Sequence, residues 1–221
     1  MSQTLTMLAA AAPLAAGWSL HSRRLHRRIE AARRDPLTGL LTRDPFQARA
    51  RKIAAAGAFA VVVIDLDGFK QINDTYGHAA GDVVIAASGQ RLGEWSRSHS
   101  GAAGRLGGDE FAAVIRVSRA RETRAAMNAL TASLAEPVEF EEHLMWVGAS
   151  AGVVQQHTGN RVADLSQLMR CADEVMYGAK QTGGGWRVGA DNAAPAYRTV
   201  NGRRDGRRGT SGDHSLEGGS L

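Results

Sequence analysis

Apolar residues concentrate between residues 35 and 189, where their spacing changes from one segment to the next. A continuous apolar run over residues 59–66 takes in an acid near its end and predicts a buried central strand. Two shorter runs, 102–106 and 111–117, predict strands on either side of the sequence Gly-Gly-Asp-Glu at 107–110. Because glycines permit the positive φ values of a tight turn, we expect these two strands to form a hairpin.

Between the strands, apolar residues recur every three or four positions, which is the spacing of a helix with one buried face. We expect helices over residues 44–56, near 70–75, from Asp82 onward, over about 119–134 and over 164–180. The first would be capped by Asp44, with Pro45 in its first helical position. Further strands are expected near 138–140 and over 144–154. Strands and helices alternate irregularly, which predicts an α+β fold with a largely antiparallel sheet.

The two ends of the chain differ from this middle region. Residues 5–20 are a run of 16 uncharged, mostly apolar residues, directly followed by a basic cluster. A membrane-spanning helix needs about 20 apolar residues, so this segment is short for one. We predict membrane association, and an interfacial helix or a disordered start stay open as alternatives. If the segment inserts, the arginines would hold the next domain on the cytoplasmic side of the membrane. Residues 190–221 lack apolar periodicity and are expected to be disordered, so that we divide the chain into residues 1–34, 35–189 and 190–221.

The charge distribution argues against a nucleic-acid partner. The net charge is +5, but residues 1–34 contribute +5 through six arginines and one glutamate, and residues 190–221 contribute +1 through five arginines and four acids. The remaining −1 falls on residues 35–189, which therefore lack the positive field that binding to a phosphate backbone requires. The single cysteine, Cys171, lies on a predicted helix and is interpreted as a core residue, and no histidine or cysteine cluster has the spacing of a zinc site.

Acidic residues mark the ends of neighbouring predicted strands. Asp65 and Asp67 close the central strand, and Asp109 and Glu110 lie in the hairpin turn. Carboxylates that converge repel one another unless a cation lies between them, and Mg²⁺ prefers oxygen ligands. The turn Gly68-Phe69-Lys70 offers backbone N–H groups and a lysine to a polyphosphate. Each feature alone also fits a helix cap, an ordinary turn or a solvated side chain, but together they predict nucleotidyl or phosphoryl transfer.

The order of these motifs resembles the GGDEF-domain diguanylate cyclase family. Residues 105–111 contain the Gly-Gly-Asp-Glu-Phe signature unaltered. Four further segments match family motifs in the same order: residues 35–43, 65–74, 76–82 and 172–180. The resemblance covers about residues 34–189 and implies a palm-like fold, similar to that of nucleotide polymerases and class III nucleotidyl cyclases, with about five strands surrounded by helices.

The resemblance implies condensation of two GTP molecules into cyclic di-GMP and two pyrophosphates by a homodimer, with the catalytic domain in the cytoplasm. Mg²⁺ or Mn²⁺ would be held by Asp65, Asp109 and the Leu66 carbonyl, with Glu110 in the same acidic cluster. Asp109 would also favour deprotonation of the attacking 3′-hydroxyl. The remaining roles are contacts to GTP: the triphosphate would meet Gly68, Phe69, Lys70, Lys180 and Arg105, and guanine would meet Asn73 and Asp82.

Two positions depart from the family pattern. Many members carry Arg-x-x-Asp before the signature as a product-binding inhibitory site, but here the corresponding residues are Ser98 and Gly101, so we expect that form of feedback inhibition to be absent. An arginine that usually follows the last lysine and contacts phosphate is replaced by Gly184, and Arg187 is a candidate substitute.

Three other functions stay open. The chain could be a catalytically inactive module that binds GTP or cyclic di-GMP, since a fold and its motifs do not establish turnover. It could be a membrane-tethered interaction protein that signals without catalysis, in which case signalling would survive Asp109→Asn. It could also make a different product, such as a mixed cyclic dinucleotide. Asp82 argues against adenine in the site, because adenine lacks the N–H groups from which this carboxylate would accept hydrogen bonds.

Overall fold

The computed structural model describes residues 18, 21–24, 30, 32–157 and 164–189, and the backbone of 199–200 and 203–204. Of the apolar segment 5–20 only Trp18 is described, so its predicted membrane association concerns residues outside the described ones. Of the tail, only two short paired strands are described, β8 (Thr199–Val200) and β9 (Arg203–Arg204). Within the described part, no helix is both long enough and apolar enough to cross a membrane.

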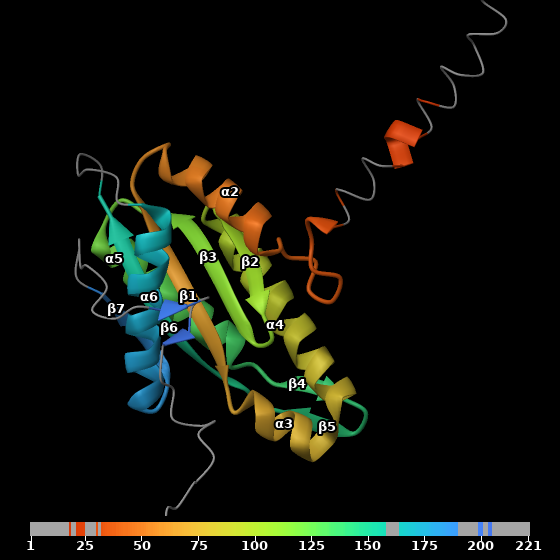
Figure 1. The fold of residues 1–221 in the computed structure, drawn as a ribbon. Helices are drawn as coiled ribbons and strands as arrows, with labels where there is room; N and C mark the ends of the chain where they lie inside the picture. Colours follow the sequence, from red (N-terminus) through yellow and green to blue (C-terminus); the bar gives the residue numbers. More distant parts are fainter. Residues whose placement is uncertain are drawn as a thin grey trace, which may run out of the picture.

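A five-stranded sheet forms the centre of the molecule (Figure 1). Its middle strand is β1 (Phe59–Asp67), which pairs antiparallel with β3 (Glu110–Arg116) on one side and with β6 (Gly148–Gln156) on the other. The edges are β2 (Ala102–Gly107), antiparallel to β3, and β7 (Gly185–Val188), parallel to β6. The predicted α+β fold with a mostly antiparallel sheet of about five strands is confirmed.

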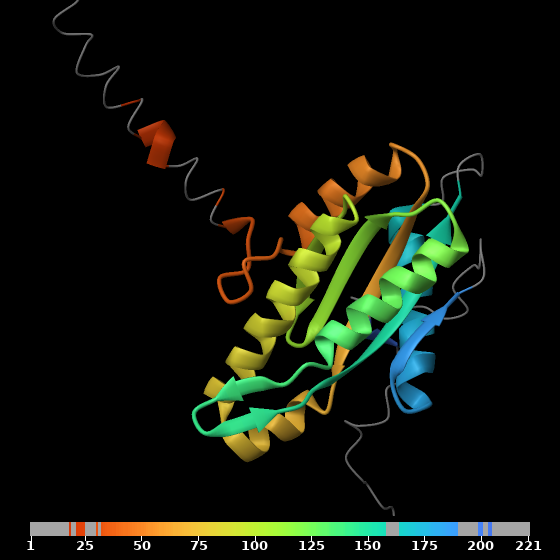
Figure 2. The ribbon, with the colours of Figure 1, turned by 180° about the vertical axis from the view of Figure 1, so that it is seen from behind.

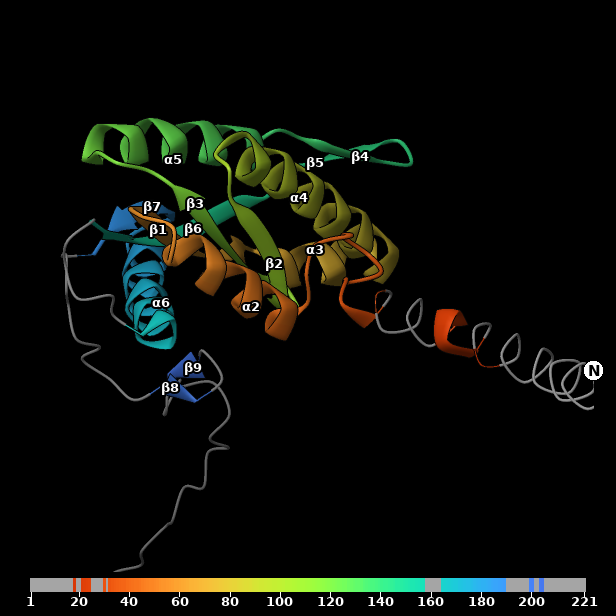
Figure 3. The ribbon, with the colours of Figure 1, turned by 90° about the horizontal axis from the view of Figure 1, so that it is seen from above.

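Helices cover both faces of this sheet (Figure 3). One face packs against α4 (His78–Ser98) and α5 (Ala120–Leu134), and the other against α2 (Arg43–Ala54) and α6 (Leu165–Gln181). Neighbouring residues of β1 therefore enter two different cores, because side chains alternate across a strand. The even-numbered apolar residues of β1 belong to the α4–α5 core, whereas Val61 and Val63 belong to the α2–α6 core.

The boundaries of two helices differ from the predictions. Helix α2 begins at Arg43 with Thr42 in the N-cap position, so the prediction of Asp44 as the cap and Pro45 as the first helical residue was wrong. Helix α4 begins at His78, four residues before the predicted start at Asp82. Gly77, with φ +84°, turns the chain directly from α3 (Phe69–Tyr76) into α4, and contacts between these two helices favour the earlier start.

The predicted strand over 144–154 is two strands. After β4 (Val138–Phe140), β5 (His143–Met145) pairs back onto it as a hairpin that extends beyond the end of the sheet (Figure 2), and β6 begins only at Gly148. Trp146 and Val147 connect the two, with Val147 buried and Trp146 exposed. The edge strand β7 was not predicted, because its glycine-rich surroundings concealed a four-residue strand.

Candidate active site

Asp65 lies near the C-terminal end of β1 and is only 3% exposed. Its cross-strand partner is Glu110, so both side chains project from the same face of the sheet. The next backbone N–H, that of Leu66, donates to the Asp109 carbonyl at 3.3 Å. The sheet thus brings together the three residues expected to hold a metal ion, Asp65, Leu66 and Asp109, beside Glu110.

Lys180 reaches the same place from the last turn of α6. Its Nζ forms an ion pair with Asp65 Oδ1, which compensates a buried carboxylate. Helix α6 can supply this lysine because it lies very close to β6: a Cβ on Gly152 would be 1.9 Å from the Ala172 carbonyl oxygen. A residue without a side chain at 152 therefore fixes the height of α6 over the sheet, and with it the position of Lys180.

Asp67 continues the acidic end of β1. Its Oδ1 accepts a hydrogen bond from Ser150 Oγ at 2.7 Å, a partner on β6 that the sequence did not single out. Gly184 borders the same carboxylate, because a Cβ there would be 2.8 Å from Asp67 Oδ2, and its φ of +91° favours glycine. The glycine found in place of the family's arginine therefore suits both a positive φ and a close approach to the Asp67 carboxylate.

The turn after β1 leaves backbone donors available. Gly68 is the N-cap of α3 with φ +70° and ψ 12°, and it provides no side-chain cap. The first N–H groups of a helix lack partners within the helix, so this end of α3 offers donors and partial positive charge to an anion. Lys70 lies exposed in the first turn, and Phe69 packs against the α4–α5 core. These features suit a phosphate group.

Asn73 and Asp82 are brought together by a glycine. Asn73 of α3 lies against Gly81 of α4, where a Cβ would be 2.0 Å from Asn73 Oδ1. Asp82 follows directly and is exposed. Among the described residues, neither side chain has a hydrogen-bond partner that would occupy it. The earlier start of α4 therefore changes the role of Asp82, which is not a helix cap and is available to a ligand together with Asn73.

Arg105 is held within the protein. Its Nε and one terminal nitrogen donate to the Gly108 carbonyl at 3.0 and 2.8 Å, and the other terminal nitrogen contacts both Asp35 carboxylate oxygens at 3.1 Å. The arginine therefore joins the signature turn to the loop before α2. Burial alone would raise the pKa of Asp35, but hydrogen bonds from Thr38 and from Arg105 outweigh it and lower that pKa below its usual value.

Comparison with known proteins identifies the family of the chain. Residues 32–185 match the family model described as "Diguanylate cyclase, GGDEF domain". The chain belongs to the GGDEF-domain diguanylate cyclase family. It is 44% identical over 170 residues to an uncharacterized 19.3 kDa protein of Streptomyces ambofaciens, covering 74% of this chain and 87% of that protein. It is 35% identical over 160 residues to the Escherichia coli diguanylate cyclase DgcN, covering 69% of this chain but only 38% of DgcN.

Solved structures of GGDEF domains have the same fold. The GGDEF domain of YfiN (TpbB) from Pseudomonas aeruginosa superposes with a TM-score of 0.64 and 29% identity, covering 72% of this chain and 95% of that one. The coiled coil and GGDEF domain of DgcB from Caulobacter crescentus give a TM-score of 0.72, covering 83% of this chain and 99% of that one. At 22% identity, the second comparison concerns the fold alone.

The metal ligands expected in this GGDEF domain are oxygen donors, the kind of ligand that Mg²⁺ prefers. Asp65 is a buried carboxylate that the Lys180 ammonium neutralises in this structure, and the backbone carbonyl of Asp109 accepts a hydrogen bond from the Leu66 N–H. No group of three or more His, Cys, Asp or Glu side chains able to hold a metal gathers among the described residues. A site made of the two expected carboxylates and one carbonyl would leave positions for water and phosphate, which is the coordination that Mg²⁺ prefers.

The structure also gives a physical reason for the missing inhibitory motif. At Gly101 a Cβ would be 2.2 Å from the Val114 carbonyl oxygen, so this GGDEF domain has no room for an aspartate there. Ser98 Oγ donates to the Trp95 carbonyl at 2.8 Å. Arg187, the candidate substitute for the missing arginine, lies on β7 opposite Gly152 and near Gly178 of α6. Cys171 is buried as predicted, and burial, followed by the charge of Glu174, raises the pKa of its thiol.

Proposed function

We propose that this chain condenses two GTP molecules into cyclic di-GMP with release of two pyrophosphates. The observation that carries the proposal is one end of the sheet where three kinds of groups meet. Carboxylates of β1 and of the signature turn lie beside the uncapped start of α3, and the Asn73–Asp82 pair follows on α3 and α4. A cation-binding group, a phosphate-binding turn and a base-reading pair are the parts that nucleotidyl transfer needs.

The chemistry exchanges one bond for another at phosphorus. The 3′-oxygen of one GTP attacks the α-phosphorus of the other, the bond to the bridging oxygen breaks, and pyrophosphate carries away the electron pair. The same exchange in the opposite direction closes the ring. Each domain offers one guanine-reading pair, so two domains must face each other, and the enzyme acts as a homodimer.

Asp65, Asp109 and the Leu66 carbonyl would hold Mg²⁺ or Mn²⁺, with Glu110 adding negative charge beside them. The bound cation would neutralise charge on the phosphates and lower the pKa of the attacking hydroxyl, with Asp109 favouring its deprotonation. Lys180 neutralises Asp65 in this structure. Once Asp65 is neutralised otherwise, Lys180 is free to reach the triphosphate from the end of α6.

The remaining residues bind and orient GTP. The N–H groups after Gly68 and the Lys70 ammonium contact the triphosphate, and Phe69 fixes the turn by packing on the core. Asp82 accepts from guanine N1–H and the 2-amino group, which rejects adenine, and Asn73 completes the contact. Arg105 would contact phosphate only by giving up part of its bonding to Gly108, so we assign it first to positioning the signature turn.

The test is product analysis of the purified chain incubated with GTP and Mg²⁺, by chromatography and mass spectrometry. We expect cyclic di-GMP, its loss with excess chelator, and a decrease of roughly 10²–10³-fold in Asp109→Asn. Asp44→Asn, which makes the same change on the exposed first turn of α2, serves as the matched control and should retain activity. GTP binding without turnover in the wild type would contradict the proposal and favour an inactive binding module.

A further inference from the structure

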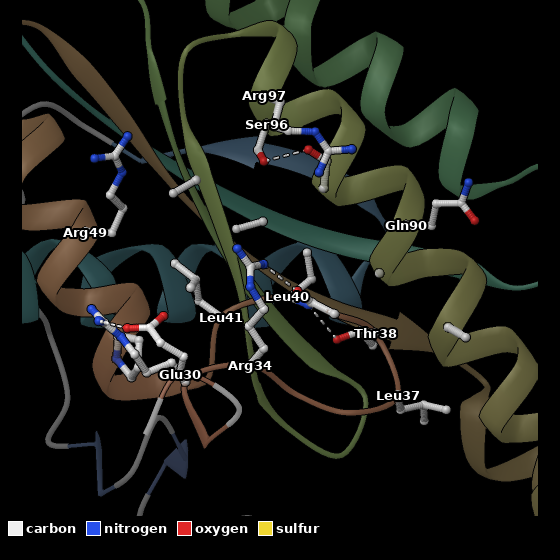
Figure 4. A pocket seen from close by; sticks show the side chains of 18 of the residues that line it. Glu30, Arg34, Leu37, Thr38, Leu40, Leu41, Arg49, Gln90, Ser96 and Arg97 are labelled. Carbon is white, nitrogen blue, oxygen red and sulfur yellow. Dashed lines mark hydrogen bonds and ion pairs between the residues drawn. The ribbon is translucent and has the colours of Figure 1, made fainter. Parts of the chain in front are cut away.

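A groove of about 920 Å³ lies at the β2 edge of the sheet, away from the acidic end of β1. Its walls are α2 and α4, and the loop of residues 33–41 closes one end. In Figure 4, Arg49 on α2 and Arg97 on α4 lie on either side of β2, with Arg34 between them. The lining also includes apolar side chains: Leu37, Leu41, Pro45, Ala48, Val83 and Ala87.

The charges around this groove are not balanced. Arg34, Arg49, Lys52 and Arg97 line it, and none of the four has a carboxylate within ion-pair distance among the described residues. The one acid of the lining, Glu30, is paired with Arg33 at 2.9 Å. Four uncompensated cations beside apolar surface favour an acidic occupant that also brings apolar side chains.

The β4–β5 hairpin has the complementary composition. Glu139, Glu141 and Glu142 are exposed, and in the described part of the chain none of them forms an ion pair. Leu144 lies directly opposite Glu139 and is 51% exposed, and Trp146, two residues further on, is 66% exposed. One face of the hairpin therefore combines acids with large uncovered apolar groups, which is unusual for a surface without a partner.

The turn of this hairpin has two unfavourable features, a positive φ at a glutamate and two adjacent negative charges. Glu141 and Glu142 form a two-residue connection between Phe140 and His143, and Glu141 adopts φ +53°. Such turns favour glycine, asparagine or aspartate, because a positive φ strains a larger side chain. Two adjacent glutamates there also repel each other. A strained turn that displays two acids at the tip of an extended hairpin indicates that the acids have a contact to make.

Both surfaces lie along α4. In Figure 3 the hairpin lies near the start of this helix, on the opposite side of it from the loop that closes the groove. Arg97 lies at the other end of α4, as its penultimate residue, and lines the groove together with Arg49 and Lys52 of α2. The hairpin of one chain therefore lies away from its own groove, so a second copy is needed to bring the two surfaces into contact.

We infer that a second copy of this chain docks its β4–β5 hairpin into the groove. The acids at the tip meet Arg49, Lys52 and Arg97, and Leu144 and Trp146 pack on the apolar lining. This pairing needs neither nucleotide nor metal, and it is separate from the pairing across the active sites that catalysis requires.

The test is sedimentation of the full chain without nucleotide or divalent cation. We expect a wild-type dimer, and a dissociation constant raised by at least about 100-fold in both R49E/K52E and E141K/E142K. R121E/R124E makes the same charge change at the same spacing on the exposed face of α5, and should dimerise like the wild type. An equimolar mixture of the two reversed variants should recover dimers, because each reversed hairpin then meets a reversed groove.

Three results would overturn the inference. A wild type that stays monomeric at roughly 100 µM has no such interface. Association that survives both reversals belongs to another surface, such as the apolar N-terminal residues. Folded variants whose mixture stays monomeric, with inorganic pyrophosphate raising the melting temperature of the wild type but not of R49E/K52E, would assign the groove to a small anion. None of the substituted residues belongs to the proposed active site, so a failed cyclase assay would leave this test unaffected.

Discussion

Two ion pairs lie at the active-site end of this domain, and they differ in their geometry and in their exposure to solvent. Arg105 binds both oxygens of Asp35 and also the Gly108 carbonyl, with side-chain exposures of 16% for the arginine and 17% for the aspartate. Lys180 meets one oxygen of Asp65, and the lysine is 37% exposed while the aspartate is 5% exposed. The first pair is a forked, enclosed contact that fixes a turn. The second pairs a buried carboxylate with a cation that solvent can reach, an arrangement suited to exchange.

The largest effect is expected from breaking the enclosed pair. Arg105→Ala leaves Asp35 without its cation and the Gly108 carbonyl without its donors, and should lower the free energy of unfolding by about 2–4 kcal/mol. Urea denaturation measures this. Arg105→Lys keeps the charge without the fork and should recover less than half of the loss. A loss below about 1 kcal/mol for Arg105→Ala would contradict the structural role.

A smaller effect is expected from the exchangeable pair. Lys180→Met removes the cation beside the buried Asp65, but partial exposure of the lysine weakens the contact, so we expect a loss of about 1–2 kcal/mol. Lys70→Met is the matched control, because Lys70 is exposed and has no ion-pair partner among the described residues. Its change should stay within about 0.5 kcal/mol. Equal losses of unfolding free energy in the two variants would mean that the ion pair of Lys180 with Asp65 does not stabilise the fold.

The helices and strands could be predicted from the sequence better than the side-chain contacts between residues far apart in it. Residues 59–66 identified the central strand because a buried strand requires continuous apolar residues, and the helix over 164–180 was evident from its spacing. The bonds of Arg105 to Asp35, of Lys180 to Asp65 and of Ser150 to Asp67 join residues 70, 115 and 83 positions apart. Only the assembled sheet brings such residues together. The start of α4 was also missed, because contacts with α3 outweigh the weak helix preference of Gly81.

Alanine substitutions at two neighbouring glycines test whether the Asp67 side chain can move, as the Lys180 side chain is expected to. Gly183 and Gly184 have φ of +99° and +91°, but only at 184 would a Cβ lie near other residues, at 2.8 Å from Asp67 Oδ2 and 3.8 Å from Ser150 Oγ. Both alanine variants should lose about 1–2 kcal/mol through backbone strain, and Gly184→Ala about 1 kcal/mol more through contact with the carboxylate. Thermal unfolding of the two variants gives this difference. Equal losses would mean that Asp67 moves aside freely.

The smallest effect concerns acid stability. The lowered pKa of Asp35 stabilises the fold above the usual aspartate value of about 3.9, and this contribution is lost as the pH falls through the lower, folded-state pKa. The free energy of unfolding, measured from pH 6 down to about 3, should therefore fall less steeply in Asp35→Asn than in the wild type. The difference in slope should correspond to an uptake on unfolding of less than about one proton per molecule. An unchanged slope would mean that Asp35 does not titrate differently in the folded chain.

Catalysis between two copies of one acidic site is tested most directly by measuring specific activity across a range of enzyme concentrations. At each concentration the chain is incubated with GTP and Mg²⁺, and the product is identified by mass spectrometry. We predict that cyclic di-GMP is formed and that the rate per molecule rises with enzyme concentration before reaching a plateau, because two half-sites must meet. A rate per molecule that stays constant on dilution would contradict transfer between exchanging copies. Absence of cyclic di-GMP at every concentration, with GTP still bound, would contradict the enzyme itself.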